Sequence, residues 1–250
     1  MYNFLKLKCT KTYPLFVKPD LLLTVKDLLF VLKDTYAGTM LDEYQASDAF
    51  QPIVDAASGH YRYAPAWGKS RIIGCPQTIA SWVVQCRSFL PDALGGLFWA
   101  GIAATAACPH IPFYACNYTT PQAYQRGERG EQSHYLKDSA YWKFENIGNL
   151  MNLFYQVSAD VVLPTWSDME DRWFSMQPWI EQTALSMQKQ DPALMADFLT
   201  DYSNGLALQA LEKADELLEI LYTRFALVNN PQTGRAYEDP KSWRRDGAVY

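Results

Sequence analysis

The strongest indication of the fold is the segment QTIASWVVQCRSFLPDALGGLFWAG, residues 77–101. In its first half the side chains alternate between two faces, which is the period of a β-strand. One face carries a mixed set of residues, namely Ile79, Ser81, Val83, Gln85 and Arg87. The other face is mainly apolar and includes Trp82 and Cys86, so we expect that face to lie in the core. A short turn at Pro91-Asp92 then leads to a second strand over 97–102.

Helical and strand-like segments follow one another in separate blocks along the rest of the chain. Thr24 and Asp27 have the spacing of a helix-capping box, which predicts a helix of about three turns ahead of the strands. A further strand is expected over 111–116. From Asp138 onward the pattern is helical. We expect helices over 138–155 and 169–187, a short helix ending near Tyr202 and a long helix over 207–225, with a kink or a new start at Pro178.

This order predicts the α+β class, or a part of a layered α/β architecture, built as a single domain over residues 1–250. The net charge of −5 argues against a nucleic-acid partner. The longest run of low polarity, 93–108, is shorter than the roughly 20 residues that span a bilayer, so we expect no membrane segment. No secretory signal is visible because lysines interrupt the first residues, and we expect a cytoplasmic protein.

The cysteines and histidines show no pattern of a metal site. Five cysteines are scattered without a CxxC pair, and the three histidines form no HxxxH motif. We therefore expect free thiols in a reducing compartment, no metal and no cofactor. Cys108 and His110 share a face if their segment is extended, but two residues do not make a catalytic dyad, and we expect Cys108 to be a buried structural residue.

Arg87 is the main candidate for a functional side chain. A guanidinium in apolar surroundings is costly unless it is paired, so it has a definite task. It can orient an anionic part of a substrate or a catalytic group by a two-point grip. Alternatively, it can close a buried structural ion pair. The strand pattern by itself leaves both alternatives open.

Five blocks of the sequence, in order, resemble the C-terminal half of the C69 dipeptidases. They are LFVKPDLLLTVKDLLFVLKDTYAGT (15–39), the segment 77–101, CPHIPFYACNYTTPQAY (108–124), DSAYWKFENIGNLMNLFY (138–155) and ADFLTDYS (196–203). The resemblance implies an N-terminal-nucleophile hydrolase with two stacked β-sheets between helical layers. It also implies cysteine-type hydrolysis of dipeptides through an acyl-enzyme, with the α-amine of the nucleophile as base.

The sequence departs from this family at its start. The family nucleophile begins the mature chain, whereas this sequence begins Met1-Tyr2, and no internal cysteine carries a free α-amine. We therefore expect a C-terminal portion, a partial sandwich that is inactive by itself. Its expected partners are a dipeptide and the missing N-terminal half as a separate chain. The alternative is a non-catalytic subunit or interaction domain that completes a partner polypeptide.

The resemblance also indicates which residues form the site. Arg87, within a Q-x-R-S-F-L-P motif, is expected to orient the nucleophile or a substrate carboxylate. Gln85, Trp142 and Asn149 are the expected substrate-binding residues. Glu145 stands where relatives are expected to carry an amide, which weakens the assignment for that helix face.

Overall fold

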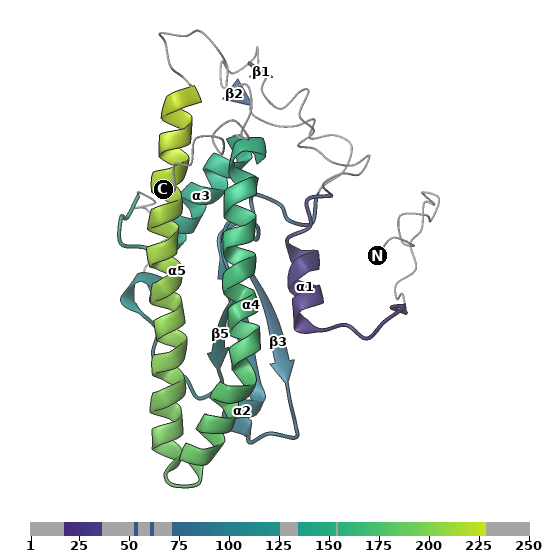
Figure 1. The fold of residues 1–250 in the computed structure, drawn as a ribbon, viewed down its shortest axis with the longest axis vertical. Helices are drawn as coiled ribbons and strands as arrows, with labels where there is room; N and C mark the ends of the chain where they lie inside the picture. The colour runs from purple at the N-terminus through teal and green to yellow at the C-terminus, as the bar shows by residue number, and fades with distance from the viewer. Residues whose placement is uncertain are drawn as a thin grey trace, which may run out of the picture.

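The computed structural model describes residues 18–36, 72–125, 135–153 and 155–228, together with two short strands, β1 (Ile53–Val54) and β2 (Tyr61–Arg62), which pair antiparallel. The remaining elements form a small sheet and a helical layer against one of its faces (Figure 1). The α+β class predicted from the sequence is confirmed at this level. The two-sheet sandwich stays a prediction.

The main sheet has three antiparallel strands in the order β3-β4-β5. These strands are β3 (Ala80–Cys86), β4 (Gly96–Ile102) and β5 (Ile111–Tyr114). The short helix α2 (Asp92–Gly95) joins the first two, and Cys86 pairs with Gly96 where they meet. Both strands of the segment 77–101 are therefore confirmed, with one turn of helix at the predicted turn.

The expectation for the apolar face of β3 is wrong. The side chains of Ser81, Val83 and Gln85 point toward the helical layer, whereas Trp82 and Val84 are 58% and 54% exposed and Cys86 is also exposed. The cause is tertiary: the polar atoms of the inward face find buried partners, and no described element covers the apolar outer face. Strand alternation separates two faces without saying which one is covered.

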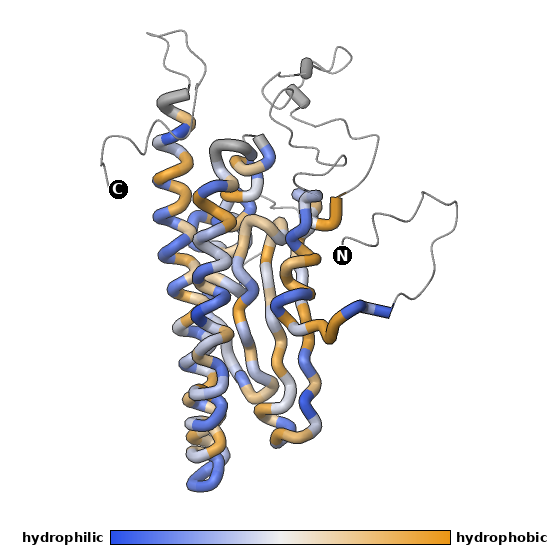
Figure 2. The backbone as a smooth tube through the Cα atoms, turned by 45° about the vertical axis from the view of Figure 1, so that its right-hand side comes forward, coloured by the Kyte–Doolittle hydropathy of each residue, from blue (hydrophilic) through white to orange (hydrophobic). Residues whose placement is uncertain are grey.

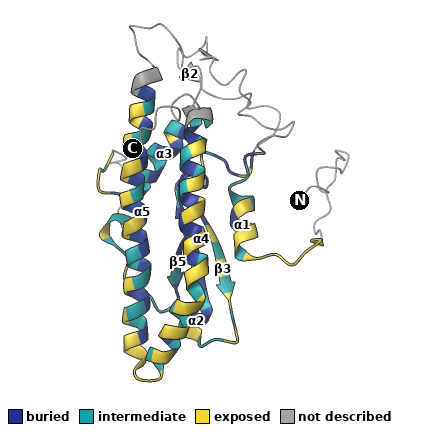
Figure 3. Ribbon diagram, viewed as in Figure 1, coloured by how far each residue is buried: buried dark blue, intermediate teal, exposed yellow. Residues whose placement is uncertain are grey.

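Helix α1 (Val25–Leu32) begins with the predicted capping box, because Thr24 and Asp27 each accept a hydrogen bond from the other's backbone N–H. It lies beside β3 and α4 (Figure 1). Leu29 is its single buried residue, and most of the helix surface is exposed (Figure 3). This helix therefore contributes little apolar surface to the core.

Three helices follow: α3 (Ala140–Leu153), α4 (Tyr155–Gln188) and α5 (Pro192–Val228), after a 3₁₀ turn η2 (Gln122–Gln125). Helix α4 continues through Pro178, where the sequence predicts a kink or a new start. This continuity excludes a new start, and the kink stays a prediction. The predicted helix end near Tyr202 is wrong, because α5 runs through it. Buried positions recur through it at Leu199, Ser203 and Leu206, so one stripe of buried positions joins both halves of α5.

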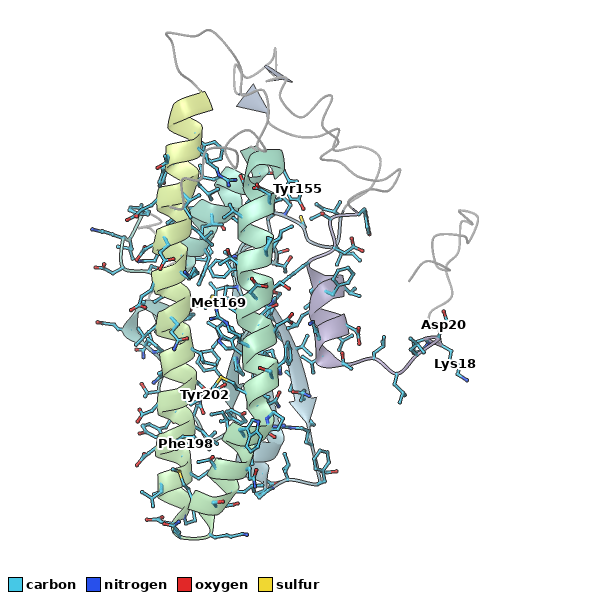
Figure 4. All side chains as sticks on the ribbon, in the orientation of Figure 1. Lys18, Asp20, Tyr155, Met169, Phe198 and Tyr202 are labelled. Carbon is cyan, nitrogen blue, oxygen red and sulfur yellow. The ribbon has the colours of Figure 1, made fainter. Side chains whose placement is uncertain are left out.

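The core lies between the sheet and the two long helices. Figure 2 shows the apolar stripe of each long helix as orange segments that alternate with blue along the coil. Figure 4 places Met169 of α4 and Tyr202 of α5 between the two helices. Two clusters of buried side chains result. One gathers around Trp166 and Phe144, and the other around Trp99 and Leu199.

Candidate functional site

Arg87 directly follows β3, and its guanidinium makes three polar contacts within the protein. Its Nη1 lies 2.5 Å from Oε1 of Glu181 on α4, with both side chains largely buried. Its Nη2 donates to the carbonyl of Leu94 at 2.8 Å, and its Nε donates to that of Gly95 at 3.4 Å. Arg87 thus fixes α2 and the end of the sheet to α4. Of the two alternatives left by the sequence, these contacts match the buried ion pair.

The Glu181 carboxylate is the centre of this group. The same Oε1 also accepts from Nε2 of Gln177 at 2.8 Å and from the hydroxyl of Tyr114 at 3.3 Å. Burial raises the pKa of Tyr114, and the neighbouring Glu181 charge raises it further. Tyr114 is therefore a neutral donor over the whole physiological range. The group is a satisfied polar cluster, in which Arg87 has its hydrogen bonds directed at protein atoms.

The other residues predicted for the site do not gather around Arg87. Gln85 accepts a hydrogen bond from Nε1 of Trp99 at 3.0 Å, inside the core. Trp142 and Asn149 lie on α3, toward the end of the sheet opposite α2 (Figure 1). Trp142 packs edge-on against Tyr141, and Asn149 is exposed. The structure thus separates the predicted substrate-binding residues into two places.

A buried polar network that the sequence did not predict lies beneath β3. The hydroxyl of Ser81 lies 2.8 Å from Nε2 of His110, and Nδ1 of His110 lies 3.4 Å from Oε1 of Glu170. That oxygen also accepts from the backbone N–H of His110 at 2.8 Å and pairs with Nζ of Lys33 at 2.6 Å. Four segments meet there: the end of α1, β3, the start of β5 and α4.

The hydrogen bonds define the tautomer of His110. A carboxylate only accepts, so Nδ1 carries the proton and Nε2 accepts from Ser81. Burial lowers the pKa of His110, and the Lys33 charge lowers it further, although Glu170 opposes both. The pKa of Glu170 is lowered because the charge of Lys33 and the bond from His110 outweigh its burial. The network therefore holds one buried ion pair and a neutral imidazole.

The order Ser-His-Glu has the connectivity of a hydrolase triad, but its surroundings differ from those of a catalytic site. His110 is completely buried and Ser81 is nearly so. A Cβ on Gly101 would lie 2.9 Å from Nε2 of His110 and 3.0 Å from Sγ of Cys108, so the backbone closes over the pair. Two features of the sequence could have indicated this network: Ser81 lies on the same strand face as Arg87, and His110 lies two residues after Cys108. No local sequence pattern indicates that Glu170 belongs to this network.

Cys108 beside this network is a structural thiol, as the sequence predicted. It is completely buried, and burial raises its pKa to about 12. A thiol in that state is a poor nucleophile, because the thiolate is the reactive form. Cys116 is half-buried, and its pKa is raised by the same cause.

A small pocket lies beyond the network, where α1 ends. Its polar lining consists of Thr35, Asn152 and Tyr155, and its apolar lining includes Ala104 and Ala107. The Thr35 and Tyr155 hydroxyls lie 3.1 Å apart. The carbonyl oxygen of the Asn152 side chain is buried with no hydrogen-bond partner among the described residues. Tyr155 marks this place at the upper end of α4 in Figure 4.

Residues 4–167 match the family model of peptidase family C69. The match covers more than half of the 250 residues. The chain belongs to peptidase family C69. The resemblance that the five sequence blocks indicated is therefore confirmed.

Three curated relatives are similar to this C69 chain. A probable dipeptidase from Latilactobacillus sakei is 26% identical over 214 residues, which cover 84% of the chain and 39% of the relative. A probable dipeptidase B from Streptococcus pyogenes serotype M1 is 21% identical over 168 residues, covering 66% of the chain and 31% of the relative. A probable dipeptidase B from Lactococcus lactis subsp. lactis (strain IL1403) is 26% identical over 140 residues, which cover 56% of the chain and 26% of the relative.

The C69 chain thus matches about two fifths or less of the length of these relatives. No helix in the described part of the chain combines the length and the apolar character needed to cross a membrane.

Proposed function

We propose that this chain is part of a dipeptidase that hydrolyses the amide bond of dipeptides through a cysteine acyl-enzyme. The match to peptidase family C69 over residues 4–167 carries this proposal. The names of the relatives, each a probable dipeptidase, support the substrate class. A dipeptide is therefore the proposed substrate.

The proposed nucleophile is supplied from outside the described residues. The raised pKa values of Cys108 and Cys116 support this, because neither thiol forms a thiolate readily. The partial coverage of the relatives supports it too, since more than half of each relative has no counterpart in the match. By itself, the 250-residue chain is proposed to be inactive.

In this proposal Arg87 is a positioning residue. It acts through Glu181 and the carbonyls of α2, which set the end of β3 against α4. Gln85 supports the same end of the sheet through Trp99. Trp142 and Asn149 stay proposals as substrate contacts at the opposite end. The side chain of Asn149 is exposed and therefore accessible to a ligand there.

The proposal is tested by assaying dipeptide hydrolysis in two preparations. One is the purified chain, and the other is the chain co-expressed with the polypeptide encoded directly upstream in the same genome. We expect hydrolysis only in the second preparation, and we expect its loss when the N-terminal cysteine of the upstream polypeptide is replaced by alanine. Turnover by the purified chain that disappears in R87A would contradict the proposed source of the nucleophile.

A second candidate function is that of a non-catalytic subunit that completes a partner polypeptide. The outer face of the sheet favours it. Across β3 and β4 the directly paired residues are apolar, with Trp82 opposite Ala100 and Val84 opposite Phe98. Phe98 is 39% exposed and stacks on Trp82 at a centroid distance of 6.3 Å. A continuous exposed apolar patch of this kind is typical of an interaction surface.

Size-exclusion chromatography tests the second candidate. We expect the purified chain to self-associate, and we expect a defined complex when the upstream polypeptide is present. A compact monomer that keeps its outer sheet face exposed and binds no partner would contradict it.

A further inference from the structure

Helix α1 contacts the rest of the protein through a small set of apolar side chains and two ion pairs. Leu29 is its one fully buried side chain, and Val25 and Leu32 pack at the edge of the same cluster. Lys26 pairs with Asp171 in solvent, where screening weakens the contact. The pair of Lys33 with Glu170 is largely buried and joins the end of α1 directly to α4. This pair is therefore the strongest polar contact between α1 and the rest of the protein.

The segment that follows α1 depends on the same connection. Asp34 accepts a hydrogen bond through its carbonyl from the N–H of Gly74 at 2.8 Å. A Cβ on Gly74 would lie 2.9 Å from the carbonyl oxygen of Lys33, so the two segments pack backbone to backbone. Thr35, the next residue, forms part of the pocket wall and bonds Tyr155. The pocket wall at Thr35 therefore begins two residues after the Lys33–Glu170 pair.

We propose that Lys33, Glu170, His110 and Ser81 form an acid-sensitive latch, which holds α1 and the Thr35 wall of the pocket closed and releases them when His110 takes up a proton. The groups that face His110 come from every element around it. They are Ser81 from β3, Cys108 from the segment before β5, Glu170 from α4 and Lys33 from the end of α1. This inference does not depend on the proposed dipeptidase function.

The sign of the pH effect follows from linkage. In the closed state burial and the charge of Lys33 hold the pKa of His110 below its ordinary value of 6.5, and the departure of Lys33 removes the second of these causes. Opening therefore takes up a proton, and acid favours opening as the pH falls below 6.5. One proton changes the opening equilibrium by at most about tenfold per pH unit.

Glu170 acts in the same direction but at a lower pH. Its pKa is lowered in the closed state, so it stabilises that state until the pH falls below the ordinary value of 4.5. Between pH 6.5 and pH 4.5, the pH dependence of the opening equilibrium is therefore due to His110.

Hydrogen exchange of the full 250-residue chain at pH 7.5 and pH 5.0 tests the latch. After correction for intrinsic rates, we expect protection of the amides in residues 25–33 to fall more than that of α5, by up to about 30-fold. The protein has three histidines, and His60 and His134 lie outside the described residues. The control H60Q/H134Q should keep the pH effect, and H110Q should lose it. An unchanged effect in H110Q, or equal changes in α1 and α5, would overturn the proposal.

A second measurement needs no substitution in the network. The variant H60Q/H134Q retains His110 as its single histidine. Its imidazole resonances should titrate with a midpoint below 6.5, and the amide resonances of α1 should shift with the same midpoint. A midpoint at or above 6.5, or α1 resonances that do not follow it, contradicts the latch whether or not H110Q folds.

Discussion

At the scale of single residues, the inward polar side chains of β3 and of the residue after it have partners far away in the sequence. Arg87 pairs with Glu181, 94 positions later. Ser81 reaches His110, which in turn reaches Glu170. A buried charge is tolerated when it is paired and its remaining hydrogen bonds are satisfied, and both networks meet that condition. The networks therefore join the sheet to α4 by specific contacts, in addition to apolar packing.

The ion pair of Arg87 and Glu181 should appear as strong coupling in a double-mutant cycle. R87M leaves a largely buried carboxylate without its cation and should lower the free energy of unfolding by about 3 kcal/mol. E181Q should have a smaller effect, about 1–2 kcal/mol, because Arg87 keeps its two carbonyl partners. Urea denaturation of both variants and of R87M/E181Q measures the coupling.

We expect the double variant to lose less stability than the sum of the two single variants. Losses that add within about 0.5 kcal/mol would mean that the two side chains do not interact. Q177A serves as the matched control, because it removes a neutral donor from the same Glu181 oxygen and leaves the ion pair in place. Its loss of stability should be smaller than that of R87M.

At the scale of elements, the long helices are set by packing more than by local signals. Helix α5 continues through Asp201, Tyr202 and Ser203, which the local sequence predicts as a helix end. Local propensity there is mixed, but Ser203 lies fully buried in the stripe that faces the core. Tertiary burial of one continuous stripe outweighs such weak preferences.

Two helical glycines give a matched pair of substitutions. A Cβ on Gly205 of α5 would meet no atom within 4 Å, whereas one on Gly148 of α3 would lie 3.3 Å from the Cβ atoms of Ala104 and Ala107. G205A should therefore stabilise the protein by about 0.5–1 kcal/mol through the gain in helix propensity. G148A should bring no such gain, because the added methyl is crowded against the segment after β4.

Thermal unfolding of both variants measures this difference. A higher melting temperature for G148A than for G205A would contradict the packing of α3 against residues 104–107. Equal melting temperatures would mean that the space around Gly205 is filled in solution.

At the scale of the whole molecule, the helical layer covers one face of the sheet, and no described element covers the apolar residues of the other. This asymmetry explains why the apolar face of β3 is outside. The alternation predicted β3 correctly, and the strands expected over 97–102 and 111–116 are present as β4 and β5. The assignment of the faces of β3 depended on which neighbours are present. The coarse fold could thus be predicted from periodicity, whereas the networks of Arg87 and His110 could not.

The exposed outer face should control association of the chain. Trp82 is 58% exposed on this face, and Trp179 is 72% exposed on α4. W82K should reduce self-association and binding of the proposed upstream polypeptide, because it places a charge in the apolar patch. W179K, which removes an equally large exposed side chain elsewhere, should leave both unchanged. Light scattering and co-purification measure the outcome, and equal behaviour of the two variants would contradict a specific role of the sheet face.

The residue order alone was enough to predict the family, the strands of the main sheet and the capping box of α1, because these depend on short periods and local motifs along the chain. Three other features emerged only from the packing of segments that are distant in sequence. Arg87 is held by Glu181, Ser81 and Lys33 meet at the pair of His110 and Glu170, and the apolar side of β3 faces outward. Periodicity specifies the two faces of an element, but the free energy of burial selects between them only when the facing segment is in place.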